Sequence, residues 1–110
     1  MNIAFASSKL RKMCNSQKER RKSRGVREGD LLGRHLDNLR AAATMEDLRD
    51  LPGRCHPLKA DRKGQYALDL AHPNRLVFSP DHAPLPELDS GGLDRSKVTA
   101  VVILGIVDYH

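Results

Sequence analysis

The sequence predicts an α+β domain in which helices pack on one face of a small, mostly antiparallel sheet. Three observations lead to this prediction. Residues 26–43 have apolar side chains at helical spacing, residues 65–79 form two alternating stretches around a turn, and residues 98–108 are an almost unbroken apolar run. A strand and helices followed by three strands are typical of α+β folds rather than of alternating α/β folds.

The first half is expected to be mainly helical. Residues 2–6 alternate as a short strand, and a helix begins near Lys9 and weakens across residues 14–17, where Asn and Ser compete with the backbone. The next helix spans residues 26–43, and Thr44 can cap one further helical turn. One apolar stripe on the long helix consists of Leu32, Leu36, Leu39 and Ala43.

The second half is expected to form most of the sheet. Residues 65–71 alternate as a half-buried strand, residues 72–74 have turn chemistry, and residues 75–79 return as the partner strand of a hairpin. Residues 80–97 hold three Pro, two Gly and several acids, which predicts a long exposed loop. Residues 98–108 are apolar on both faces, so this strand is expected to be central in the sheet.

Length and composition exclude several classes of protein. The 110 residues fit one domain spanning residues 1–110. The longest apolar run, residues 100–107, is far shorter than the roughly 18 residues of a membrane-spanning helix. Lys9, Arg11 and Lys12 interrupt the region where a signal peptide would be apolar, and two cysteines are too few for a disulfide-stapled secreted scaffold. We therefore expect a soluble cytoplasmic domain without a membrane partner.

Positive charge is concentrated near the N-terminus. The formal net charge is +5, and residues 9–27 contain nine Lys and Arg against the single acid Glu19. Such a segment attracts polyanions and supplies salt-sensitive phosphate contacts, although a solvated helix face would have the same composition. With no Trp, two Phe and two Tyr, the chain lacks an aromatic platform for stacking bases. The composition favours nucleic acid as a partner, but not a reader that stacks on its bases.

Ionisable residues next to the predicted strands match the needs of metal-independent RNA cleavage. This reaction needs a base for the 2′-hydroxyl proton, an acid for the leaving 5′-oxygen and cations for the charge on phosphorus. Histidine, with an ordinary pKa of about 6.5, suits either proton role, and arginine can bind two phosphate oxygens at once. If the hairpin and the last strand are neighbours, these groups would come from His56, His110, Arg75 and Lys63.

Simpler interpretations of the same residues stay open. The terminal Tyr109 and His110 can be a frayed chain end, His56 can be a loop residue bonded to a backbone carbonyl, and Arg75 can pair with Asp69 across the hairpin. The cysteines and histidines lack the spacing of a zinc site, so we expect neither a metal nor another cofactor. Glycine-rich phosphate loops and GxSxG motifs are absent from the sequence.

Four motifs resemble those of HigB-type toxins, members of the RelE/ParE superfamily of bacterial toxin–antitoxin systems. They are LPGRCHPL (51–58), DRKGQY (61–66), NRLVF (74–78) and VVILGIVDYH (101–110), and the similarity covers roughly residues 48–110. The resemblance implies a RelE-like fold and a ribosome-dependent endoribonuclease, an mRNA interferase, that cleaves mRNA in the ribosomal A site and arrests translation. It also implies a HigA-type helix-turn-helix antitoxin, through which operator DNA is contacted indirectly.

The resemblance also assigns roles to individual residues. His56 matches the loop histidine of the family, Arg75 matches an arginine that contacts the scissile phosphate, and Lys63 falls in the basic turn. The terminal catalytic trio of the family is matched by Asp108, Tyr109 and His110. In this interpretation the two histidines share the acid and base work, the aspartate orients, and the tyrosine positions the nucleotide. The basic residues expected to bind rRNA or mRNA are Arg20, Arg21, Lys22, Arg24 and Arg62.

Two functions other than mRNA cleavage are compatible with the sequence. One is a ParE-like DNA gyrase poison of the same superfamily, which needs no paired histidines for binding. The other is a non-catalytic nucleic-acid-binding module in which the basic segment does all the binding. The loop of residues 80–97 is longer than in compact family members and acidic, which is unusual for a surface that faces RNA.

Overall fold

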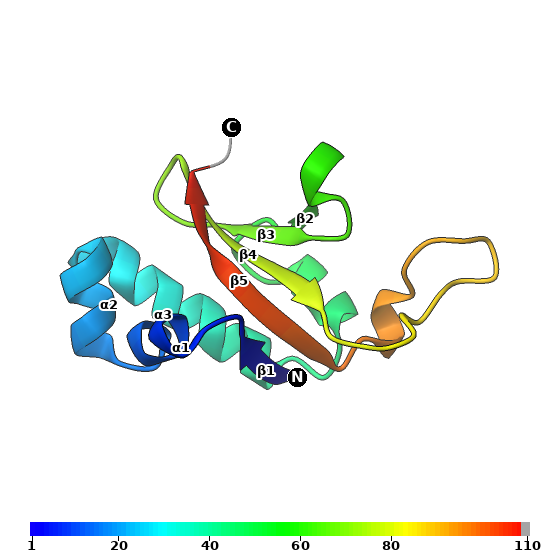
Figure 1. Cartoon of the computed structure of the whole chain (residues 1–110), viewed down its shortest axis with the longest axis horizontal. Helices are drawn as coiled ribbons and strands as arrows, with labels where there is room; N and C mark the ends of the chain where they lie inside the picture. The colour runs from blue at the N-terminus through cyan, green and yellow to red at the C-terminus, as the bar shows by residue number, and fades with distance from the viewer. Residues whose placement is uncertain (109–110) are drawn as a thin grey trace.

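Five strands form one sheet in residues 1–108, the part of the chain that the computed structural model describes (Figure 1). The strands are β1 (Asn2–Phe5), β2 (His56–Pro57), β3 (Tyr66–Asp69), β4 (Asn74–Pro80) and β5 (Ala100–Asp108). Their order across the sheet is β1-β5-β4-β3-β2. β1 runs parallel to β5 and the other neighbours are antiparallel, which confirms the predicted α+β fold with a mostly antiparallel sheet.

Most of the helical residues precede β2. The α-helices are α1 (Ser8–Cys14), α2 (Gln17–Arg24) and α3 (Val26–Ala41), and the short 3-10 helices are η1 (Met45–Asp50), η2 (Ala60–Arg62) and η3 (Arg95–Lys97). The sequence pattern does not predict α2, where Ser16 caps the helix by accepting from the backbone N–H of Glu19 at 3.2 Å. Since no residue of α2 is buried, the helix has no apolar stripe by which it could be recognised.

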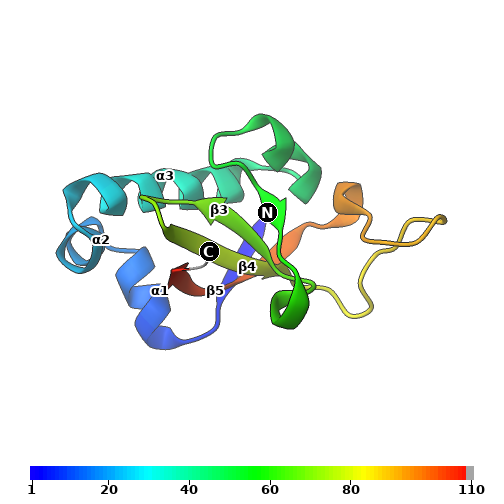
Figure 2. The same ribbon diagram turned by 90° about the horizontal axis from the view of Figure 1, so that it is seen from above.

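The main core lies between α3 and one face of the sheet. Leu32, Leu36 and Leu39 of α3 are fully buried and belong to one cluster with Phe78 of β4 and Ile103 of β5. α3 runs along one side of the sheet (Figure 2). The helix ends at Ala41, before the predicted last member of its stripe. Ala43 is consequently exposed, and the extended Ala42 is buried instead.

The other face of the sheet, here called the open face, has a smaller apolar cluster. Leu58, Ala67 and Val77 are buried there, with Leu104 and Val107 packed against them. β5 lies between β1 and β4 along residues 100–103, and beyond these residues it pairs with β4 alone. β5 is therefore an interior strand, as predicted, but the middle position belongs to β4.

The acidic loop after β4 is folded, not irregular throughout. An isolated bridge joins Glu87 and Leu93, and the backbone N–H of Leu88 donates to Gly92 O at 2.9 Å. The loop extends away from the sheet, at the end of the molecule opposite α1 and α2 (Figure 1). Across residues 1–108, none of the helices combines the length and the apolar character needed to span a bilayer.

Candidate active site on the open face of the sheet

Strand register places three ionisable side chains on the open face. His56 of β2 pairs with Ala67 of β3, and two positions further along β3 Asp69 pairs with Arg75 of β4. Paired residues and residues two positions apart in a strand share a face, so His56, Asp69 and Arg75 point to the same side. Val77, two residues after Arg75, belongs to the apolar cluster of this side. The open face therefore presents an imidazole, a carboxylate and a guanidinium together.

The Asp69 carboxylate lies between two arginines. Arg54 Nε donates to Asp69 Oδ2 at 2.8 Å, Arg54 Nη2 donates to Oδ1 at 3.3 Å, and Arg75 Nε lies 3.1 Å from Oδ1. The hydrogen bond to Asp69 is the main reason that the pKa of the Arg54 guanidinium is raised above its ordinary value. The cross-strand pair of Asp69 and Arg75 that the sequence allows is confirmed. Arg54, inside the LPGRCHPL motif, is a further member that the sequence analysis does not single out.

Arg75 is held firmly but not saturated with hydrogen bonds. Its side chain is only 14% exposed. Nη1 donates to the carbonyl oxygen of Pro73 at 3.4 Å, whereas the buried Nε–H is not aligned for a hydrogen bond with any acceptor in residues 1–108. The guanidinium of Arg75 therefore has the Asp69 carboxylate as its ion-pair partner and the Pro73 carbonyl as a weak acceptor.

The tautomer of His56 follows from one contact. Its Nδ1 lies 2.7 Å from the carbonyl oxygen of Arg54. A carbonyl oxygen only accepts, so Nδ1 has the hydrogen, and in the neutral ring Nε2 has the lone pair. The bond to a backbone carbonyl that the simple interpretation expects is thus confirmed for Nδ1, although His56 begins β2 and does not lie in a loop. The same bond turns Nε2 into the ring nitrogen that can take a proton.

The loop before His56 is fixed by close packing against α3. Gly53 has φ +114°, and a Cβ at this position would lie 3.0 Å from Cε1 of His35 and 3.1 Å from Cδ2 of Leu68. Arg54 follows with φ 52°, an uncommon conformation for a residue with a side chain. The backbone N–H of Asp69 donates to Gly53 O at 2.7 Å. This sharp turn directs the Arg54 side chain to Asp69 and the Arg54 carbonyl to His56.

A buried histidine supports this turn from below. His35 is 2% exposed, and its Nε2 lies 2.7 Å from the backbone carbonyl oxygen of Asp69, so Nε2 donates. Burial is the main reason that the pKa of His35 is lowered from its ordinary value. A neutral His35 therefore ties α3 to the end of β3 beneath the open face.

Asp108, one of the predicted catalytic residues, lies on the other face. It pairs with Asn74, while its neighbour Val107 pairs with Arg75. Asn74 faces the helices, because its Nδ2 donates to Oε1 of Glu28 at 2.9 Å. Strand alternation therefore places Asp108 beside Asn74 and opposite to the face of Arg75. The remaining members of the predicted trio, Tyr109 and His110, lie outside the described residues.

The basic turn is also separate from Asp69 and its two arginine partners. Lys63 is exposed and follows η2, so its turn leads into the start of β3, whereas Asp69 and Arg75 pair at the end of that strand. Arg62 Nη1 donates to the Gln65 side chain at 3.2 Å. The structure thus brings together His56 and Arg75 among the predicted residues, and it leaves Lys63 and Arg62 at the other end of β3.

Three of the four basic residues predicted on α2 have partners inside the protein. Arg20 Nε donates to Gly29 O at 3.1 Å, and its Nη1 donates to Cys14 O at 2.8 Å. The other two form ion pairs, Arg21 with Asp30 at 2.8 Å and Arg24 with Glu28 at 2.8 Å. Lys22 is exposed and forms no side-chain hydrogen bond or ion pair with the rest of residues 1–108. Three of the four predicted RNA-binding residues therefore also connect α2 to α1 and α3.

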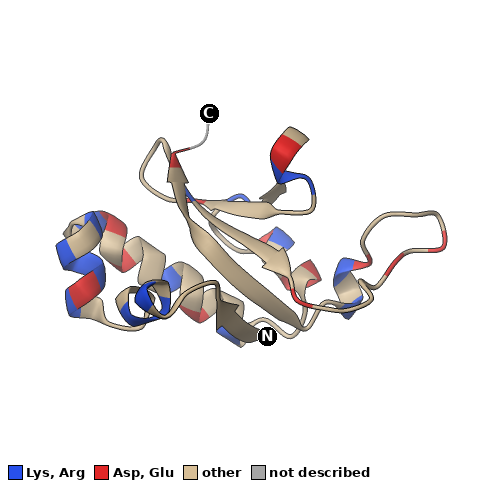
Figure 3. Ribbon diagram, viewed as in Figure 1, with Lys and Arg blue, Asp and Glu red and all other residues tan. Residues whose placement is uncertain are grey.

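Exposed cations are nevertheless gathered at this end of the molecule. In Figure 3 much of the ribbon of α1 and α2 is blue, which marks Lys and Arg residues. The exposed members of the segment are Lys9, Arg11, Lys12, Lys18, Arg21, Lys22 and Arg27. Arg20 is bonded internally and Arg24 is half-buried, but the exposed cations alone give this surface the positive potential that the sequence predicts.

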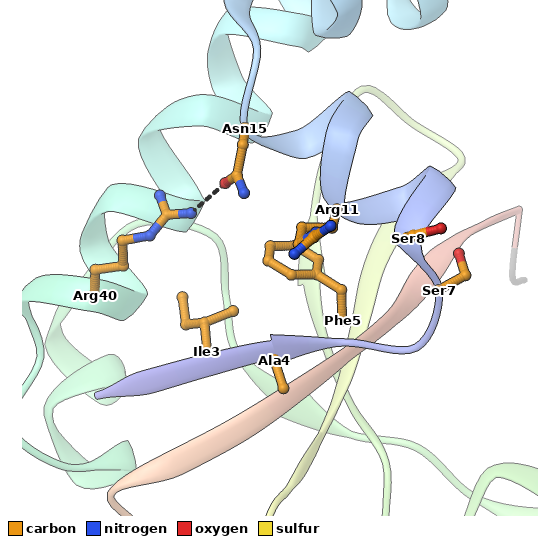
Figure 4. A pocket seen from close by; sticks show the side chains of 8 residues that line it. All are labelled: Ile3, Ala4, Phe5, Ser7, Ser8, Arg11, Asn15 and Arg40. Atoms are coloured by element: carbon orange, nitrogen blue, oxygen red, sulfur yellow. Dashed lines mark hydrogen bonds between the residues drawn. The ribbon is translucent and has the colours of Figure 1, made fainter.

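A pocket of about 680 Å³ lies away from the candidate site, between β1, α1 and α3. Arg40 Nη2 donates to Asn15 Oδ1 at 2.6 Å on its wall (Figure 4). The wall consists of Ile3, Ala4, Phe5, Ser7, Ser8, Arg11, Asn15 and Arg40. Its ionisable side chains are two arginines, which cannot act as general base at neutral pH. The pocket therefore does not offer acid–base chemistry.

The described residues offer no metal-binding cluster and no activated cysteine. Within residues 1–108, no three His, Cys, Asp or Glu side chains gather where they could hold a metal ion. Burial raises the pKa of the Cys14 thiol to about 11 and is also the main reason that the pKa of the Cys55 thiol is raised. Neither cysteine is an activated thiolate. Within the described residues, His56 together with Arg54, Asp69 and Arg75 is the best candidate for chemistry.

Comparison with solved structures identifies the fold. The YoeB/ParE toxin from Agrobacterium tumefaciens matches over 100% of both chains, with a TM-score of 0.61 and 12% sequence identity. The fold is that of the YoeB and ParE toxins. The YoeB–YefM complex from Staphylococcus aureus matches 100% of this chain and 97% of that chain, with a TM-score of 0.58 and 16% identity.

The sequence itself gives no comparable match. Protein-family models do not match the chain, and a search of curated proteins found no match either. The likeness to YoeB and ParE toxins therefore concerns the arrangement of helices and strands. It agrees with the RelE-like architecture that the sequence predicts. In this YoeB-like fold, His56, Asp69 and Arg75 lie on the open face, on β2, β3 and β4 respectively.

Proposed function

We propose that the protein is a type II toxin of the HigB kind that cleaves mRNA in the ribosomal A site. The observation that favours this activity is the joint placement of His56 and Arg75 on the open face, with Asp69 and Arg54 between them. An imidazole and a mostly buried cation on one face of the sheet are the kinds of group that deprotonate a ribose 2′-hydroxyl and stabilise the charge on phosphorus. The likeness to YoeB and ParE toxins supports the toxin class.

The proposed reaction uses groups of the chain. His56 Nε2 takes the proton from the ribose 2′-hydroxyl, and the 2′-oxygen attacks phosphorus while the bond from phosphorus to the 5′-oxygen breaks. Arg75 stabilises the additional charge on the phosphoryl oxygens. His110 protonates the leaving 5′-oxygen, and Tyr109 positions the nucleotide. The products are a 2′,3′-cyclic phosphate and a free 5′-hydroxyl, and no metal takes part in these steps.

The remaining predicted residues bind the substrate or its surroundings in this proposal. Asp108 orients the chain end from the helix side of the sheet, beside Asn74. Lys63 and Arg62 contact mRNA phosphates beyond the start of β3. The exposed bases of α1 and α2 contact rRNA, with Lys22 as the member of the predicted set that has no internal partner among residues 1–108.

The partners follow from the same proposal. A structure of similar fold is a complex of YoeB with YefM, which supports a neutralising antitoxin for this chain. We expect a HigA-type helix-turn-helix protein that links the toxin to operator DNA. Acting on ribosomes places the protein in the bacterial cytoplasm.

The second candidate function is a ParE-like gyrase poison, because one structure of this fold is described as a YoeB/ParE toxin. A translation reaction with purified protein separates the two. The interferase cuts a reporter mRNA inside its reading frame when ribosomes are present and leaves it intact without them. Intact mRNA together with loss of gyrase supercoiling activity would replace the interferase with the gyrase poison. Intact mRNA with unaffected gyrase would favour the passive nucleic-acid binder.

A further inference from the structure

Asp69 contacts both arginines of the candidate site and the residues that support them. Its carboxylate binds the guanidinium of Arg54 and lies 3.1 Å from Arg75 Nε. Its backbone N–H donates to Gly53 O at 2.7 Å, and its carbonyl oxygen accepts from His35 at 2.7 Å. One residue at the end of β3 thus connects the loop before β2, the strand β4 and the helix α3.

These contacts lead directly to the imidazole. The Asp69 carboxylate fixes the Arg54 side chain with two hydrogen bonds, and the carbonyl of the same Arg54 fixes Nδ1 of His56 at 2.7 Å. Arg54 has φ 52°, and in this sharp turn its side chain and its carbonyl meet these two partners simultaneously. The orientation of Nε2 in His56 therefore depends on Asp69.

The charge balance excludes a simple phosphate-binding role for Asp69. A carboxylate repels the phosphodiester and lowers the positive potential of Arg54 and Arg75. The Arg54 side chain is 65% exposed, so solvent screens its ion pair with Asp69 and the pair contributes little to stability. An anion that weakens RNA attraction, yet holds one exposed and one mostly buried cation in fixed geometry, fits a role in orientation.

We propose that Asp69 is the positioning residue of the site, which sets His56 through Arg54 and sets Arg75 directly. The proposal rests on the proposed RNA cleavage. Asp69 touches neither substrate nor reacting atoms. It fixes the base and the phosphate-binding cation relative to each other, at the expense of some attraction for RNA.

The test compares Asp69→Asn, Asp69→Glu and the matched control Asp37→Asn. Asp37 has an 81% exposed side chain in a long ion pair of 3.7 Å with Arg40 on α3, and its substitution changes the net charge equally. Cleavage of a reporter mRNA on ribosomes is measured for kcat and KM. Binding of the protein to ribosomes that hold an mRNA with 2′-deoxy substitution at the cut site is measured separately.

For Asp69→Asn we expect kcat to fall by about tenfold or more, with KM and binding unchanged or improved, because orientation is lost while net positive charge rises. Asp69→Glu keeps the anion and is expected to recover most of kcat. Asp37→Asn should match the wild type. A structural residue would instead affect thermal stability and binding together with kcat.

Two results would overturn the positioning role while leaving the proposed cleavage intact. One is wild-type kcat in Asp69→Asn, and the other is equal loss of kcat in Asp69→Glu and Asp69→Asn with both variants folded. If Asp69→Asn does not fold, the Asp69→Glu variant decides alone, since the proposal requires it to keep most of kcat. A wild-type protein that cuts no mRNA would contradict the proposed function itself.

Discussion

Asn74 Nδ2 donates to the carboxylate of Glu28 at 2.9 Å, which connects the first residue of β4 to α3 across 46 positions of the chain. The other oxygen of this carboxylate accepts from Arg24 Nε at 2.8 Å. Glu28 is only 6% exposed, so its two partners compensate the burial of its charge. This contact fixes the beginning of β4, where Arg75 follows and Asp108 pairs.

Removing this carboxylate is expected to destabilise the protein. Glu28→Ala leaves the Asn74 amide and the Arg24 guanidinium without their buried partner, so we expect a loss of about 2 kcal/mol in the free energy of unfolding. Urea denaturation followed by circular dichroism measures this loss. Glu46→Ala serves as control, because Glu46 pairs with Arg49 at the surface. An equal effect of both substitutions would contradict a special role for the buried carboxylate.

Arg20 and Lys22 are expected to act differently although they are only two positions apart in sequence and equal in charge. Arg20→Ala removes the side chain that donates hydrogen bonds to the carbonyl oxygens of Gly29 and Cys14. It should lower the free energy of unfolding by about 1–3 kcal/mol. Lys22→Ala should change it by less than about 0.5 kcal/mol and instead weaken binding to ribosomes, with a smaller salt dependence. Unfolding and ribosome binding at several salt concentrations measure both effects. Equal loss of stability in the two variants would contradict the assignment.

Acid should weaken the protein partly through His35. Burial lowers the pKa of His35 in the folded state below its ordinary value of 6.5, so the unfolded chain binds the proton more strongly. The contribution is fully present above pH 6.5 and is lost as the pH falls through the folded-state pKa. Denaturation at pH 7.5 and at successively lower pH compares wild type with His35→Gln. A steeper loss in the variant would contradict this sign.

Gly53 tests the packing of the loop that precedes His56. With φ +114° and a prospective Cβ 3.0 Å from the His35 ring, Gly53→Ala strains the backbone and displaces a buried ring. We expect a destabilisation of about 1–3 kcal/mol and slower cleavage. Gly64→Ala is the matched control, since its φ is +89° but no atom lies within 4 Å of its prospective Cβ. Cleavage equal in both variants would show that the contact with His35 does not orient the loop.

The hairpin and its charged pair are predictable from the sequence because their information is local. Alternation in residues 65–71 and 75–79 sets the faces of β3 and β4, and the turn between them brings Asp69 opposite Arg75. The apolar stripe of α3 is predictable for the same reason, up to Leu39. These elements need no knowledge of distant contacts.

Other features depend on contacts that spacing does not show. α2 forms without a buried residue, and its Arg20 enters the helix pair beside Gly29 and Gly33. Two glycines four residues apart in α3 were the available signal for this close approach. Arg54 could not be singled out, because its role arises from a turn with positive φ values that brings it to a carboxylate on another strand.

Whether His56 performs chemistry on mRNA is decided by the rate of ribosome-dependent cleavage by His56→Ala, measured beside His72→Ala. His72 is an exposed histidine in the turn before β4 and has no assigned role, so its loss should leave the rate unchanged. We expect His56→Ala to keep its fold and its binding to ribosomes while the cleavage rate falls by about 100-fold or more. Cleavage by His56→Ala at the rate of His72→Ala would contradict the claim.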